Sequence, residues 1–306
     1  MTPRFAAFFL RRLLAALGFV LVVSIAALVL AHFAPGDATT ELVLSHVSPE
    51  SIARERAELG LDRPLAVQLA QWSAGLARMD LGMSSAFRRP VTELLSERAP
   101  RTAELAGVAL VLATLVGLPL GMLTGARPRS ALALVVAPIS IALVACPPIV
   151  GALALLWLGV STGWLSVAPG ALAAPALALA VPLGAMLERL QSQATRDTMS
   201  AGDLRAAAAR GLPPSRLLWI HASRQSLRPV LGVYGIVIGS LFSGSLAVEV
   251  VTNWPGLGRL MYDALMGRDV FLVAGCALLG AMFLAAGNLI ADLARAWVDP
   301  RVTVEA

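Results

Sequence analysis

The side chains that could carry out catalysis are few and widely separated in this chain of 306 residues. Its three histidines are His32, His46 and His221, and none of them lies in the middle of a long apolar segment. A nucleophile with its base, or a cluster of metal ligands, would need such residues close together. The chain also contains no lysine, which a phosphate-binding P-loop requires. We therefore expect no catalytic residue, no metal site and no cofactor on this chain.

A second group of polar side chains is spaced for binding rather than for catalysis. Residues 202–230, which lie between two strongly apolar segments, contain five arginines: Arg205, Arg210, Arg216, Arg224 and Arg228. Guanidinium groups at this density make the segment too basic to lie in lipid. Two interpretations are open, a solvated loop between two apolar segments or a surface that docks on a partner.

The residues around these arginines predict a helix, a sharp corner and a second helix. The alanines at 206–209 favour a helix, because alanine loses no side-chain entropy there. Gly211 can take the left-handed conformation that ends a helix, and the prolines at 213–214 prevent the same helix from continuing. The second helix is expected to end near Leu227, before Pro229.

Composition places the whole chain among membrane proteins. Hydrophobic residues make up 58% of it and charged residues 14%, which leaves too little polar surface for a soluble domain. The net charge of +5 does not indicate nucleic-acid binding, because the arginines are not interleaved with aromatic residues on one surface. They lie instead at the ends of apolar segments, next to what we expect to be a lipid bilayer.

Six apolar segments are each close to the length that a membrane-spanning helix needs. They cover approximately residues 13–33, 102–125, 131–158, 170–187, 230–251 and 270–294. The expected fold is an all-α membrane protein with six transmembrane helices. We divide it into residues 1–33 with the first span, a polar helical insertion at 34–101, and a five-helix core at 102–306.

The distribution of arginine predicts the orientation in the membrane. Arginine is in excess at the N-terminus, at Arg127 and Arg129, and at residues 188–228, where seven arginines face three acids. With six spans all three regions fall on one side, and the positive-inside rule makes that side cytoplasmic. Both termini are therefore expected in the cytoplasm, and the insertion at 34–101 outside it.

The fifth apolar segment carries two faces of different character. Gly235, Gly239 and Ser243 recur every four residues and suit close packing against another helix, in this chain or in a partner. Tyr234, Ser245 and Glu249 lie on a separate stripe that could line a polar pathway. Alternatively, Glu249 simply lies at the outer interface of the membrane.

The residues of the arginine-rich segment also resemble a known motif. Arg205-Ala206-Ala207, followed by Gly211, resembles the EAA loop of bacterial ABC importer permeases, although the Glu of the usual motif is Arg205 here. The Arg at this position, with His221-Ala222 and the step from Gly211 to Pro229, resembles the dipeptide/oligopeptide/nickel branch. Asp203 departs from that branch, which usually has an aromatic residue there.

Further motifs extend the resemblance over nearly the whole chain. Pro35-Gly36-Asp37 follows the first span, and residues 249–259 form a turn-rich loop after the fifth. Residues 288–292 and the closing Asp299-Pro300-Arg301 resemble the same branch. Four such motifs in the right order and topology are far more specific than any one of them.

The resemblance implies a permease subunit of a heteromeric importer in the bacterial cytoplasmic (inner) membrane. Its implied partners are a second homologous permease, two ABC ATPase subunits that hold ATP and Mg, and an extracytoplasmic substrate-binding protein. Residues 188–229 would form the cytoplasmic coupling loop, with contacts from Asp203, Arg205, Ala206, Ala207, Arg210, Gly211 and Arg216. The outer loop that would face the binding protein contains Trp254, Pro255, Gly256 and Gly258.

The implied substrate class is di- or oligopeptides, with nickel or another small solute as the alternative. A channel and an intramembrane enzyme are remote alternatives. Nothing in the sequence resembles a selectivity filter, and no histidine lies in the middle of a predicted span.

Overall fold

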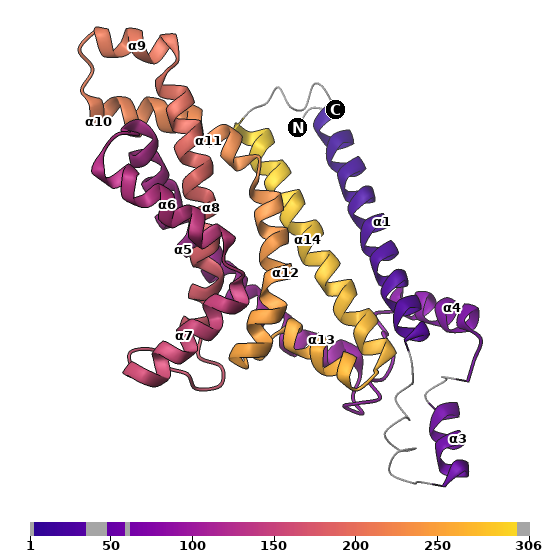
Figure 1. Ribbon diagram of the computed structural model, residues 1–306. Helices are drawn as coiled ribbons and strands as arrows, with labels where there is room; N and C mark the ends of the chain where they lie inside the picture. The colour runs from indigo at the N-terminus through magenta and orange to yellow at the C-terminus, as the bar shows by residue number, and fades with distance from the viewer. Residues whose placement is uncertain (1–2, 35–47, 59–61, 299–306) are drawn as a thin grey trace. The chain divides into compact units, whose positions relative to one another are not determined.

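The computed structural model describes residues 3–34, 48–58 and 62–298, and over these ranges it is almost entirely helical (Figure 1). An isolated antiparallel bridge joins Met83 to Pro90. The predicted all-α class is thus confirmed for the described residues. The helices are α1 Pro3–Phe33, α3 Pro49–Glu58, α4 Leu65–Leu76, α5 Val91–Ala126, α6 Ala131–Ala145, α7 Pro148–Thr162, α8 Ala173–Met199, α9 Gly202–Ala209, α10 Pro214–Arg216, the π-helix η1 Leu217–Ala222, α11 Ser223–Leu231, α12 Tyr234–Thr252, α13 Leu257–Met266 and α14 Val270–Val298.

Five of the described helices are long and apolar enough to cross a membrane: α1, α5, α8, α12 and α14. Helices α6 and α7 pass the same test only together, and they are bent by 104° at the break between them. The expected number of six spans is reached if this bent pair is counted as one span. The sequence analysis placed one apolar segment at 131–158, and the structure divides it into these two helices.

Two consecutive prolines account for the break between α6 and α7. Cys146 and Pro147 have extended backbone conformations, with ψ of 118° and 140°, and Pro148 occupies the first turn of α7. A residue before proline is driven out of the helical region, so the pair ends one helix and can only begin another.

The chain divides into two compact units, described separately below. The first, called the core unit, comprises residues 1–13, 104–254 and 286–306. The second, called the insertion unit, comprises residues 14–103 and 255–285. Helix α5 runs without interruption through residues 101–102, where the sequence analysis placed the start of the five-helix core.

Helix α8 is the centre of the core unit, because α6, α7, α9, η1, α11 and α12 all contact it. A buried apolar cluster fills the space between these helices, with Leu105, Leu179, Leu187, Val237 and Trp254 among its members. In the membrane such a cluster gives packing and shape rather than a hydrophobic driving force, since lipid is equally apolar.

A row of glycines brings α5 and α8 into close contact. A Cβ atom added to Gly117 or Gly121 would lie 2.5 Å from the carbonyl oxygen of Gly184 or Glu188, respectively. A Cβ on Gly125 would clash in the same way with the carbonyl of Ser192. Only glycine fits where two helix backbones approach this closely. The repeat every four residues was visible in the sequence but was not singled out there.

One residue of the small-residue face predicted on α12, Gly235, meets a helix of this chain. A Cβ on Gly235 would lie 2.6 Å from Asn288 Oδ1 of α14, and Gly287 of α14 lies against Ile238. The side chain of Ser243 is outside the described residues. The sequence left open whether the neighbouring helix belongs to this chain or to a partner. At Gly235 the neighbour is α14 of this chain.

In the insertion unit, one buried carboxylate joins a loop to the start of α14. Asp269 is 1% exposed, and its Oδ2 accepts hydrogen bonds from Ser84 Oγ at 2.6 Å and from Ala86 N at 3.1 Å. Its Oδ1 accepts from Leu272 N at 3.0 Å and thereby caps the first turn of α14. Thr102 Oγ1 similarly accepts from Leu257 N at 2.7 Å, at the start of α13.

Candidate coupling surface

The arginine-rich segment forms the expected helix and corner at one end of the core unit (Figure 1). Helix α9 covers Gly202–Ala209, and Gly211 has φ of +85°, the left-handed conformation predicted for it. A Cβ atom at Gly211 would meet nothing within 4 Å. A side chain there would therefore be disfavoured by its own backbone conformation, and not by a clash with neighbours.

The second helix is longer than expected and partly of another type. Residues Leu217–Ala222 form a π-helix, and α11 continues to Leu231 with Pro229 inside it. The prediction of an end near Leu227 was therefore wrong. Proline costs an internal hydrogen bond, but buried neighbours on either side, Ser226 and Val230, hold this turn against the core.

The inner face of α9 packs on its own chain. Leu204 and Ala207 are 3% and 9% exposed and belong to a buried cluster with Met122 of α5 and with Leu217, Leu218 and Ala222. A freely solvated loop would leave these side chains in water. The cluster instead holds α9 in place through apolar contacts with α5 and η1.

The outer face of α9 and of the corner after it carries most of the predicted coupling residues. Arg205, Ala206, Arg210, Gly211 and Arg216 are all exposed. We call these five residues the α9 surface. Ala207 belongs to the inner face, and the side chain of Asp203 is outside the described residues. The three arginines give this surface a positive charge suited to an acidic partner.

A buried polar network lies beneath the α9 surface and was not predicted. Thr124 Oγ1 donates to Glu188 Oε1 at 2.7 Å, which links α5 to α8. Gln191 Nε2 donates to Ser226 Oγ at 2.8 Å, which links α8 to α11. It also donates to Thr195 Oγ1 at 3.0 Å, whereas the buried Gln191 Oε1 has no partner among the described residues.

The signal for this network was present in the sequence. Glu188, Gln191, Ser192 and Thr195 recur with the spacing of one helix face, in the part of α8 nearest α9. Buried polar groups of this kind are hydrogen-bonded in native proteins, so they specify how three helices fit together.

The three residues proposed for a polar pathway are largely engaged within the chain. Tyr234 Oη and Thr114 Oγ1 share a hydrogen bond of 2.9 Å between α12 and α5. Ser245 Oγ donates to the carbonyl of Phe242 at 3.0 Å, and Ser245 and Glu249 are 1% and 0% exposed. That these residues line a pathway stays a prediction.

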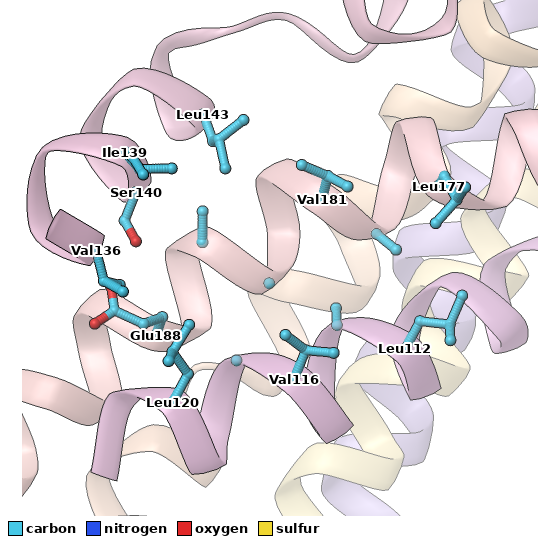
Figure 2. A pocket seen from close by; sticks show the side chains of 15 residues that line it. Leu112, Val116, Leu120, Val136, Ile139, Ser140, Leu143, Leu177, Val181 and Glu188 are labelled. Carbon is cyan, nitrogen blue, oxygen red and sulfur yellow. The ribbon is translucent and has the colours of Figure 1, made fainter. Parts of the chain in front are cut away.

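Hollows between the described helices of the core unit include the following two. One, of about 600 Å³, lies at the α6–α7 break and is lined by Pro147, Pro148, Pro182, Leu241 and Gly244 among others. The other, of about 270 Å³, lies between α5, α6 and α8 (Figure 2). Prolines at the first hollow free backbone carbonyls that can face water in a membrane protein.

The residues of the predicted outer loop are more buried than a receptor-facing loop would suggest. Trp254 is 2% exposed and belongs to the apolar cluster of the core unit, while its neighbour Asn253 is exposed with φ of 54°. In the insertion unit Gly256 and Gly258 are buried and Pro255 is half-buried. A contact with a binding protein at these positions stays a prediction.

Similarity to known proteins covers almost all of the chain. Residues 117–304 match the model of a family described as the binding-protein-dependent transport system inner membrane component, and residues 5–106 match the model of its N-terminal region. Both matches agree with the resemblance drawn from the motifs.

Three relatives illustrate the range of this similarity. The oligopeptide transport system permease protein AppB of Bacillus subtilis is 31% identical, over 97% of this chain and 99% of its own. A putative peptide transport system permease protein of Brucella abortus is 32% identical, over 97% and 98%. The glutathione transport system permease protein GsiC of Salmonella paratyphi A is 30% identical, over 96% and 97%. This chain is thus a member of the family of binding-protein-dependent transport system inner membrane components.

Proposed function

We propose that this chain is the permease subunit of an ATP-driven importer and carries peptides across the bacterial inner membrane. The observation that carries the proposal is the similarity along nearly the full length to permeases named for oligopeptides, peptides and glutathione. These names favour a peptide over nickel as the substrate. The candidate spans and the absence of lysine from the sequence are consistent with a membrane subunit that does not bind ATP through a P-loop.

The proposed machine contains a second homologous permease, two ABC ATPases that hold ATP and Mg, and an extracytoplasmic binding protein. Hydrolysis on the ATPases must then reach this chain through a contact between subunits. The α9 surface is suited to that contact, because it is exposed and basic while its inner face is fixed to the core unit. Its movement would pass through η1 and α11 to α8, which the Gln191–Ser226 hydrogen bond joins.

The translocation pathway would lie between the two permeases and open alternately to each side. The 600 Å³ hollow at the α6–α7 break is a candidate for part of the wall on this subunit. It reaches Leu241 of α12, which lies one turn before Ser245 on the same helix face, so it borders the stripe on which the pathway residues were predicted.

The proposed orientation has both termini and α9 in the cytoplasm. Single cysteines at Asn253 and Ser215, both exposed, should react differently in intact cells after Cys146 and Cys276 are replaced by alanine. A membrane-impermeant maleimide should label Asn253→Cys and should label Ser215→Cys only after the membrane is opened. The opposite pattern would reverse the topology and remove α9 from the reach of cytoplasmic ATPases.

Reconstitution in liposomes tests the transport function itself. The complete set of four kinds of subunit should take up a labelled di- or oligopeptide when ATP is present, and the loaded binding protein should stimulate hydrolysis. Liposomes without the second permease should show neither activity. Uptake by this permease alone with ATPases and binding protein would contradict the heteromeric assembly. ATP-independent flux would indicate a channel, and uptake of nickel without uptake of any peptide would refute the proposed substrate class.

A further inference from the structure

A buried carboxylate lies at one end of the 270 Å³ cavity between α5, α6 and α8. Glu188 is 3% exposed, and its side chain lines the cavity together with leucine, valine, isoleucine, alanine and glycine residues (Figure 2). Ser140 of α6 is the only other polar residue in the lining. Figure 2 shows the Glu188 carboxylate near Val136, with Leu112 and Leu177 toward the opposite end of the cavity.

Among the described residues, the Glu188 carboxylate has no positively charged partner. Glu188 accepts a hydrogen bond from Thr124 at 2.7 Å. No ion pair to Glu188 is found among the described residues, and no other residue in the cavity lining is charged. A buried carboxylate is costly unless it is paired or fully hydrogen-bonded. A cation supplied from outside the chain would remove this cost.

The cavity extends from Glu188, near the end of α5, to Leu112 and Leu177 in the apolar parts of α5 and α8 (Figure 2). Glu188 lies beside Thr124, close to the end of α5 at Ala126 and to the basic turn that follows it. Leu177, eleven positions earlier on α8, is about 16 Å away along the helix axis. An occupant that fits this arrangement is an amphiphile, with a cationic group at one end and a hydrocarbon chain at the other.

We propose that this cavity binds an aminophospholipid, with part of one acyl chain between α5, α6 and α8 and the ammonium group against Glu188. Phosphatidylethanolamine supplies the cationic end, because its primary ammonium donates hydrogen bonds to the carboxylate. Its phosphate must lie outside the cavity, because the lining contains no basic residue. The quaternary ammonium of phosphatidylcholine has no N–H to donate, so the site discriminates between the two headgroups. The inference rests on the chain lying in a bilayer and not on the proposed transport of peptides.

Lipid retention tests the site directly. The full-length protein is purified with the subunits that accompany it, and placed in nanodiscs of equal phosphatidylethanolamine and phosphatidylcholine with phosphatidylglycerol. It is then released into detergent, and the retained lipid is measured by mass spectrometry. Wild-type protein should keep phosphatidylethanolamine in preference to phosphatidylcholine. Glu188→Gln should lower that retention about tenfold or more, the factor expected for a lost charge-assisted hydrogen bond.

Two further variants separate the lipid site from general effects. Asp197→Asn removes an exposed acid from the same helix and should leave retention unchanged. Ser140→Leu fills the cavity from α6 and should expel the acyl chain while Glu188 remains. This variant also tests the proposal if Glu188→Gln does not fold.

Equal retention of both lipids, or retention unaffected by Glu188→Gln and Ser140→Leu, would overturn the proposal. So would wild-type protein without bound lipid, the result expected if a second permease fills the cavity. Glu188-dependent retention in a protein that transports no peptide would refute the transport function and leave the lipid site standing.

Discussion

Uptake should fall about tenfold or more when Arg205 and Arg210 are both changed to glutamate, although the protein still inserts in the membrane. Both side chains belong to the α9 surface and are exposed, so neither supports the fold. If the α9 surface docks on an acidic partner, reversing two charges turns attraction into repulsion, which lowers association more than it disturbs packing. The effect should be largest at low ionic strength and should shrink as salt screens the exposed charges.

The measurement is ATPase binding to the permease in detergent, followed by uptake and ATP hydrolysis in liposomes. Arg127→Glu with Arg129→Glu is the matched control, because these two arginines are also exposed and follow the end of α5, outside the α9 surface. The control should bind ATPase normally. If the Arg205 and Arg210 double variant binds ATPase as tightly as wild type at low salt, the α9 surface is not the docking site.

Replacing Gly121 with leucine should prevent the core unit from packing correctly. A Cβ at this position would lie 2.5 Å from the Glu188 carbonyl oxygen and 2.7 Å from Gln191 Cβ. These atoms belong to the backbone and to the first side-chain carbon, so no change of rotamer relieves the clash. Overpacking costs about 1–3 kcal/mol where neighbours can adjust, and more where they cannot. The same displacement would also separate Thr124 from Glu188.

Gly107→Leu provides the control on the same helix, because a Cβ at Gly107 meets nothing within 4 Å. Leucine favours a helix over glycine by roughly 0.7 kcal/mol, so this variant should be at least as stable as wild type. Thermal unfolding followed by size-exclusion chromatography compares the two. Equal midpoints for Gly121→Leu and Gly107→Leu would show that α5 and α8 do not approach each other as closely as described.

The local structure of the segment after α8 could be predicted because single residues determine it. Gly211 and the prolines at 213–214 restrict their own backbone angles, and the corner forms where these restrictions occur. The end of the second helix could not be read in this way. Pro229 opposes a helix locally, but the packing of its buried neighbours outweighs that preference.

The contacts between helices were harder to predict, for a different physical reason. Membrane helices are apolar on every side, so hydrophobic periodicity does not tell which face meets which neighbour. The row at Gly117, Gly121 and Gly125 and the polar positions around Gln191 were the usable signals, since small and polar residues need particular partners. Trp254 shows the opposite case, because an aromatic residue after a span suits both an interface and a core.

The seating of α9 on its own chain has a mechanical consequence. A helix attached only at its two ends could move some distance before it displaced the rest of the chain. Leu204 and Ala207 restrict such movement of α9, because they are already in contact with Met122 of α5 and with η1. A force applied to the α9 surface would therefore act directly on the end of α5 and on η1. If the proposed ATPases press on this surface, even a short displacement would reach η1, which contacts α8.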